Sequence, residues 1–183
     1  MTMNPIDFLA QYYDLNSRAF KILVEHGSQV ADKAREAAKN VPELTPDLEF
    51  IETAAMLHDI GIFLTRTPQF GCSGKHPYIC HGILGSALLK EKGHSELALV
   101  CERHVGVGIS IEDIQRQNLP LPKRDMIPLS IEEQIICFAD KFFSKTGNGR
   151  PAEKSIAEII DNLSRYGPDK AQRFESWVKK FEA

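Results

Sequence analysis

The adjacent pair His58-Asp59 stands inside an apolar stretch of this 183-residue chain. The apolar residues on either side are Ala54, Ala55, Met56, Leu57, Ile60, Ile62, Phe63 and Leu64. An ionised carboxylate is costly to bury there, because it loses its hydration and regains nothing from apolar neighbours. A divalent metal ion resolves the conflict, since imidazole and carboxylate groups both bind first-row transition cations. A hydrogen-bonded pair at a helix end is the alternative, and the dipeptide alone favours it.

Four further ligand-type residues occur in similar settings: His26, His81, His104 and Asp140. Helical periodicity places His26, His104 and Asp140 on the same faces as apolar neighbours three and four residues away, and His81 begins another helical stretch. A single residue of this kind is most simply a core histidine with a hydrogen-bond partner. Six ligand-type groups, on the inward faces of different or adjoining helices, instead indicate one shared metal site.

This ordered set, with the His-Asp-Ile-Gly form of its central motif, resembles the HD-domain superfamily of metal-dependent phosphohydrolases from about Phe20 to Arg150. The resemblance implies four core ligands, which match His26, His58, Asp59 and Asp140. It also implies a second metal, because the extra histidines of two-metal members match His81 and His104. Asp59 would then bridge the ions, with His26, His58 and Asp140 on one ion and His81 and His104 on the other.

The expected reaction is hydrolysis of a phosphate ester or anhydride in a nucleotide or small phosphorylated metabolite, with His58 and Asp59 at the catalytic centre. Two cations about 3.5–4 Å apart polarise a phosphoryl oxygen and generate the attacking hydroxide near neutral pH. The histidine-rich ligand set suits Fe, Mn, Co, Ni or Zn better than Mg or Ca. Two alternatives stay open: a di-iron oxygenase of the same superfamily, and a non-catalytic module that binds or senses a nucleotide.

Candidate substrate contacts lie on both sides of the ligand set. Lys145 and Arg150 follow Asp140 and are suited to binding a phosphate, although a solvated basic turn explains them equally well. Lys75 and His76 lie in the segment Gly71–Pro77, where His76 is either a proton donor or an ordinary loop histidine. The resemblance does not extend to the cyclic dinucleotide phosphodiesterases of the superfamily, because the chain lacks the Gly-Tyr-Pro of their motif and its second aspartate, three residues after Asp140, so cyclic-di-GMP is a poor candidate substrate.

Composition agrees with a single domain that binds a small molecule. Hydrophobic residues make up 43% of the chain and the net charge is −3, whereas nucleic-acid and membrane-surface binders normally carry a basic excess. No apolar run approaches the roughly 20 residues of a membrane helix, and the N-terminus does not resemble a signal peptide. The cysteines form no Cys-x-x-Cys pair, which indicates reduced core residues in a cytoplasmic protein: Cys72, Cys80, Cys101 and Cys137. A monomer or a homodimer is expected.

The elements that must position these residues are predicted to be helices throughout, in an all-α HD-domain bundle over 1–183. The expected helices lie near 6–14, 17–39, 47–58, 79–92, 95–104, 110–117, 130–144, 152–165 and 169–181. Thr45-Pro46 is a helix start signal, and Ser130 with Glu133 forms the pattern of a capping box. The metal-site core occupies about 20–150, and an amphipathic extension over 152–183 covers it or, alternatively, supports dimerisation.

Overall fold

The computed structural model describes residues 3–145 and 152–182 of the chain. The α-helices are α1 Pro5–Leu9, α2 Arg18–Lys39, α3 Leu48–Leu57, α4 His81–Glu91, α5 Ser95–Arg103, α6 Ile111–Arg116, α7 Ile131–Asp140, α8 Ile156–Ser164 and α9 Pro168–Phe181. Short 3-10 helices lie at η1 Pro42–Leu44, η2 Ile60–Leu64, η3 Pro68–Phe70 and η4 Tyr78–Cys80. The predicted all-α fold is therefore confirmed.

A small hairpin is the one strand pairing that the described ranges contain beyond isolated bridges. Its strands are β1 Arg66–Thr67 and β2 Cys72–Ser73, which pair antiparallel with Arg66 opposite Ser73. The sequence analysis predicted no strand here, because two residues are too few to show the alternation of apolar and polar side chains that marks a strand.

Several helix ends differ from the predicted ones for local reasons. Asp47, rather than Thr45, caps α3, because its side chain accepts a hydrogen bond from the backbone N–H of Phe50 at 2.9 Å. Helix α8 begins four residues later than expected, since Ser155 and Glu158 form a reciprocal capping box at its first turn. Helix α7 ends at Asp140, not near residue 144, and α1 ends at Leu9 rather than near 14.

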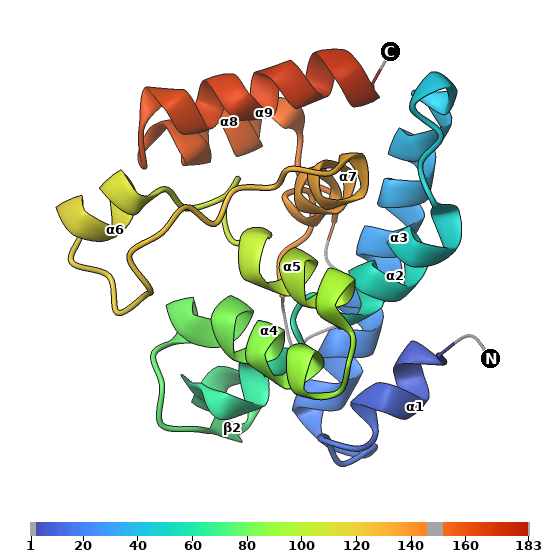
Figure 1. The fold of residues 1–183 in the computed structure, drawn as a ribbon, viewed down its shortest axis with the longest axis vertical. Coiled ribbons are helices and arrows are strands. Elements are labelled where there is room, and N and C mark those ends of the chain that lie inside the picture. The colour runs from blue at the N-terminus through green and yellow to red at the C-terminus, as the bar shows by residue number, and fades with distance from the viewer. Residues whose placement is uncertain (1–2, 146–151, 183) are drawn as a thin grey trace.

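Helix α7 is the centre of the fold, with α5 on one side and the α8–α9 pair on the other (Figure 1). Its residues Ile135, Ile136 and Phe138 are completely buried. The Phe138 ring stacks on Phe174 of α9, with ring centroids 5.3 Å apart, and its centroid lies 5.3 Å from that of Phe181. The C-terminal helices thus cover the core, as predicted.

The four cysteines are free and buried, as the sequence analysis expected of core residues. Among the described residues, no helix combines the length and the apolar character needed to cross a bilayer.

Candidate metal centre

Helix ends bring five of the six predicted ligands together, and the sixth comes from the middle of a helix. His58 caps the C-terminus of α3, Asp59 directly precedes η2, and His81 is the first residue of α4. His104 caps the C-terminus of α5 and Asp140 is the last residue of α7. The sixth ligand, His26, lies within α2. All six side chains are buried, with at most 6% of any residue exposed.

Close backbone approaches allow these helices to meet. A Cβ placed on Gly61 would lie 2.2 Å from the carbonyl oxygen of His81, and one on Gly82 would lie 2.5 Å from that of Cys101. Only glycine fits at such separations. Gly61 therefore allows η2, which follows Asp59, to lie against the start of α4, and Gly82 allows α4 to lie against α5. These contacts explain the glycine of the His-Asp-Ile-Gly motif.

The two oxygens of Asp59 face different sets of histidines. Oδ2 lies 3.1 Å from Nε2 of His58 and 3.6 Å from Nε2 of His26. Oδ1 lies 3.2 Å from Nε2 of His81 and 3.4 Å from Nε2 of His104. A carboxylate in this position can contribute one oxygen to each of two groups of histidines.

Asp140 belongs to the Oδ2 side of this centre. Its Oδ1 lies 2.9 Å from Nε2 of His26 and 3.5 Å from Nε2 of His58. Two overlapping groups have ligand atoms within 4.8 Å of one another, namely His26, His58 and Asp140, and His58, Asp59 and His104. This proximity is compatible with a bound divalent cation.

Hydrogen bonds to backbone carbonyls orient three of the histidine rings. The Nδ1 atom of His58 lies 2.6 Å from the carbonyl oxygen of Ala55. In the same way, Nδ1 of His81 lies 2.7 Å from the carbonyl oxygen of Tyr78, and Nδ1 of His104 lies 2.8 Å from that of Cys101. A carbonyl oxygen can only accept, so each Nδ1 carries the proton. In the neutral ring, Nε2 then presents its lone pair to the centre, as a metal ligand requires.

The buried nitrogen and oxygen atoms of this centre are better satisfied by a cation than by one another. With their protons on Nδ1, His81 and His104 bring two Nε2 lone pairs within 3.0 Å of each other. In the described ranges, Nε2 of His58 and Oδ1 of Asp59 are buried without a hydrogen bond, and Oδ2 of Asp59 has only its ion pairs. Buried polar groups are normally satisfied, and a metal ion would satisfy all of these atoms at once.

At neutral pH, His26, His104 and Asp59 are in the protonation states that bind a metal, whereas His58 would have to release a proton to do so. Burial lowers the pKa of His26 to about 4 and that of His104 to about 3, so both rings are neutral. Burial alone would raise the pKa of Asp59, but the positive charges of His58 and Lys145 hold it well below its usual value. Burial lowers the pKa of His58, yet Asp59 and Asp140 outweigh it and raise the net value to about 9.

Lys145 and Lys141 supply positive charge beside the carboxylates. The Nζ atom of Lys145 lies 2.8 Å from Oδ2 of Asp59 and 3.8 Å from Oδ1 of Asp140. The Nζ atom of Lys141 lies 2.7 Å from Oδ2 of Asp140. Lys145, predicted as a substrate contact, is thus brought to the centre. Because a cation beside Asp59 would compete with its ammonium group, Lys145 is well placed to turn toward an anion.

Two of the other predicted substrate contacts, Lys75 and His76, are not brought to the centre. Lys75 and His76 are exposed, and neither lines the cavity next to Asp140. The backbone of His76 instead joins the hairpin region through hydrogen bonds with Leu64 and Arg66. Arg150 lies outside the described residues.

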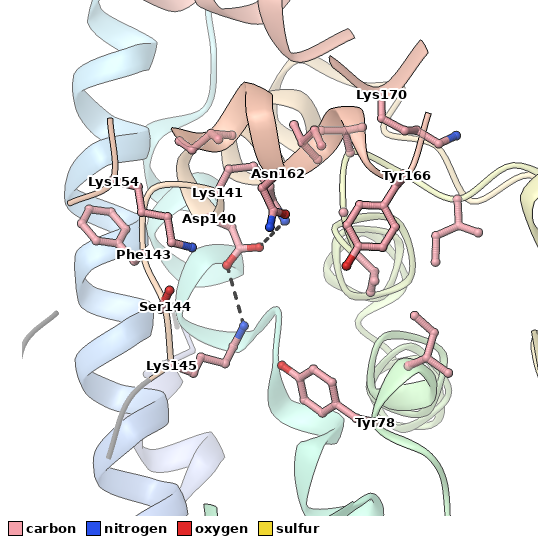
Figure 2. A pocket seen from close by; sticks show the side chains of 18 of the residues that line it. Tyr78, Asp140, Lys141, Phe143, Ser144, Lys145, Lys154, Asn162, Tyr166 and Lys170 are labelled. Carbon is pink, nitrogen blue, oxygen red and sulfur yellow. Dashed lines mark ion pairs between the residues drawn. The ribbon is translucent and has the colours of Figure 1, made fainter. Parts of the chain in front are cut away.

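A cavity of about 740 Å³ opens beside the metal centre, with Asp140 and Lys145 in its wall. Figure 2 shows other side chains that sequence reasoning did not select: Tyr78, Lys154, Asn162 and Tyr166. Lys154 lies just before α8, Asn162 within it and Tyr166 just after it, and the sequence presents this helix only as an amphipathic cover. Tyr78 stacks on the ring of His81, with centroids 4.6 Å apart. No motif in the sequence marks these residues.

Comparison with known proteins places the site in a family. Residues 23–144 match the HD domain family. An uncharacterized protein of Methanocaldococcus jannaschii is 32% identical over 161 residues, which cover 78% of this chain and 88% of that protein. No solved structure is significantly similar.

Two other relatives are longer proteins, each named tRNA (cytidine(56)-2'-O)-methyltransferase. The one from Thermoplasma volcanium is 29% identical over 160 residues, which cover 87% of this chain and 41% of the relative. The one from Picrophilus torridus is 32% identical over 130 residues, which cover 70% of this chain and 33% of the relative. The chain therefore spans less than half the length of either methyltransferase.

Proposed function

Because the chain belongs to the HD-domain family, we propose that it is a metal-dependent phosphohydrolase that cleaves a phosphate ester or anhydride at a two-metal centre. The observation that carries this proposal is the division of the Asp59 carboxylate between two histidine sets. His26, His58 and Asp140 would hold one cation, and His81 and His104 the other, with Asp59 shared. A transition metal such as Fe, Mn, Co, Ni or Zn suits these ligands.

When bound, such cations supply Lewis acidity to a phosphoryl group and make hydroxide available near neutral pH. The chain provides the arrangement in which this chemistry is useful. Buried Asp59 and Asp140 remain ionised, and the carbonyls of Ala55, Tyr78 and Cys101 keep the Nε2 lone pairs directed inward. Metal-ligating histidines held by such partners bind more tightly and in a fixed orientation.

The cavity supports a nucleotide or another phosphorylated metabolite as substrate. Its volume of about 740 Å³ lies within the usual range of small-molecule sites. Lys141 and Lys145 line it next to Asp140, so a phosphate bound in the cavity would lie near their ammonium groups. These charges favour an anionic substrate over a neutral one.

Phosphate release tests the proposal. Purified protein loaded with Mn²⁺, Co²⁺, Ni²⁺ or Fe²⁺ is incubated with a panel of nucleotides and sugar phosphates, under argon and in air. We expect metal-dependent phosphate release under argon, and its loss in Asp59→Asn. The matched control is Asp161→Asn, because Asp161 is exposed on α8 and pairs with Arg165 at the surface.

Other outcomes identify the alternatives. Turnover of Asp59→Asn at the wild-type rate would refute the proposal. Substrate-dependent oxygen uptake with iron, and no phosphate release under argon, would indicate a di-iron oxygenase. Ligand-induced stabilisation without any product would indicate a binding module.

A further inference from the structure

The cavity beside the metal centre contains more positive charge than its carboxylates neutralise. Four lysines line it, against three carboxylates: Lys141, Lys145, Lys154 and Lys170, and Asp113, Asp140 and Glu158. Asp140 forms ion pairs with Lys141 and Lys145, of which Lys145 also pairs with Asp59, and the effect of Asp140 on the pKa of Lys154 is larger than that of Glu158. If Asp140 binds a cation, as the proposed function requires, it shares its negative charge with the metal. That charge then no longer neutralises most of the positive charge of the lysines.

Lys154 is the ammonium group that this arrangement leaves without a partner. It is half-buried and, within residues 3–145 and 152–182, it forms no salt bridge. Burial lowers the pKa of its amine, and the nearby charges of Lys141 and Lys145 lower it further, whereas Asp140 opposes them. An anion that enters the cavity would therefore stabilise the ammonium form of Lys154 by a charge-assisted hydrogen bond.

The other carboxylate near Lys154 is already engaged. Glu158 lines the same cavity, but its Oε2 accepts hydrogen bonds from the backbone N–H of Ser155 at 2.7 Å and from the Ser155 hydroxyl at 2.8 Å. Those bonds cap α8, so turning Glu158 toward Lys154 would uncap the helix.

The rest of the cavity is suited to a planar, largely apolar group. Ile159 and Leu163 of α8 contribute aliphatic surface, and Tyr78 and Tyr166 contribute aromatic rings. In Figure 2 the ammonium groups of Lys145 and Lys154 point toward Asp140 from two sides, whereas Tyr166 lies farther along the cavity. Aromatic side chains commonly stack on nucleobases.

We propose that Lys154 is part of a second anion subsite, and that the ligand of this cavity is a nucleotide carrying at least one phosphate beyond the one held at the metal centre. The metal centre and Lys145 hold the first phosphate, Lys154 the second, and the aromatic and aliphatic wall the base. The assignment rests on the proposed function for the phosphate at the metals and for the cation that takes up the charge of Asp140. Lys154 lies outside the family match at residues 23–144, so it is a feature of this chain's own C-terminal part.

Binding calorimetry tests the subsite without requiring turnover. Protein loaded with Mn²⁺ is titrated with adenosine 5'-monophosphate, adenosine 5'-diphosphate and adenosine 3',5'-bisphosphate. We expect wild type to bind at least one of the two doubly phosphorylated ligands about tenfold more tightly than the monophosphate, which corresponds to one additional charged contact. Lys154→Ala should lose this preference and retain its affinity for the monophosphate.

Two variants separate this role from a structural one. Lys154→Arg retains the charge and should preserve the preference even if Lys154→Ala is less stable. Lys179→Ala removes one positive charge from an exposed position on α9 and should behave as wild type. A wild type without the preference, or a Lys154→Ala variant that keeps it, would overturn the subsite.

Phosphate release in the same samples distinguishes the two proposals. Hydrolysis without a preference for the second phosphate would leave the phosphohydrolase standing and remove the subsite. A preference that depends on Lys154, without any hydrolysis, would establish the subsite and refute the phosphohydrolase.

Discussion

Removing one histidine from the Oδ1 side of Asp59 should halve the stabilisation that metal gives this protein. A ligand present at 100 times its dissociation constant stabilises a folded protein by about 2.7 kcal/mol. Two ions would therefore contribute about 5 kcal/mol, and His81→Ala should retain about half of this. For a chain of this size, about 1 kcal/mol shifts the Tm by roughly 2–4 °C. We expect a rise of about 11–22 °C in wild type and about 5–11 °C in the variant.

The assay is thermal unfolding with and without Mn²⁺, combined with elemental analysis of protein purified anaerobically. Two ions per chain are expected in wild type, falling toward one in His81→Ala. The control is His76→Ala, since His76 is exposed and outside the centre. His104→Ala serves as a second variant on the same side if His81→Ala folds poorly. An unchanged stoichiometry and Tm shift in both variants would refute the assignment of these histidines as ligands.

Two further predictions concern the elements that support the centre. Tyr13→Phe should destabilise the protein by about 2 kcal/mol in urea unfolding, because its buried hydroxyl donates to the carbonyl of Ile60 at 2.7 Å and accepts from the N–H of Phe63 at 3.0 Å. Tyr12→Phe, which removes a hydroxyl without a hydrogen-bond partner in the described ranges, should have almost no effect, and equal effects would contradict this reasoning. The second prediction concerns Asp113, whose pKa burial would raise but hydrogen bonds from Lys170 and Ser110 lower to about 2. Because this pKa is depressed on folding, the associated stability of about 2 kcal/mol is present above pH 4 and is lost as the pH falls toward 2. Urea unfolding of wild type and Asp113→Asn should therefore converge by about 1.5 kcal/mol between pH 4.5 and 2.5, and a constant difference would count against the pair.

Periodicity predicted the helices well because burial of one face is a local property of the sequence. Residues such as Leu23 and Val30 recur on the inward face of α2, and both are buried. Helix ends were harder to predict, since they depend on which side chain forms the cap. Thr45 and Asp47 are both good caps by type, and only the folded backbone shows that Asp47 accepts the bond from Phe50.

The sequence by itself determined the types and order of the candidate ligand residues and the family to which the chain belongs. Only the tertiary structure decided how the histidines are divided between the two oxygens of Asp59. Oδ1 faces His81 and His104, and Oδ2 faces His26 and His58. The tertiary structure also brought Lys154 of the C-terminal part into the same cavity as Lys145. The physical reason is that periodicity reports only which face of a helix is buried. The distance between side chains on different helices depends on packing, including the close approach at Gly61, which no local pattern encodes.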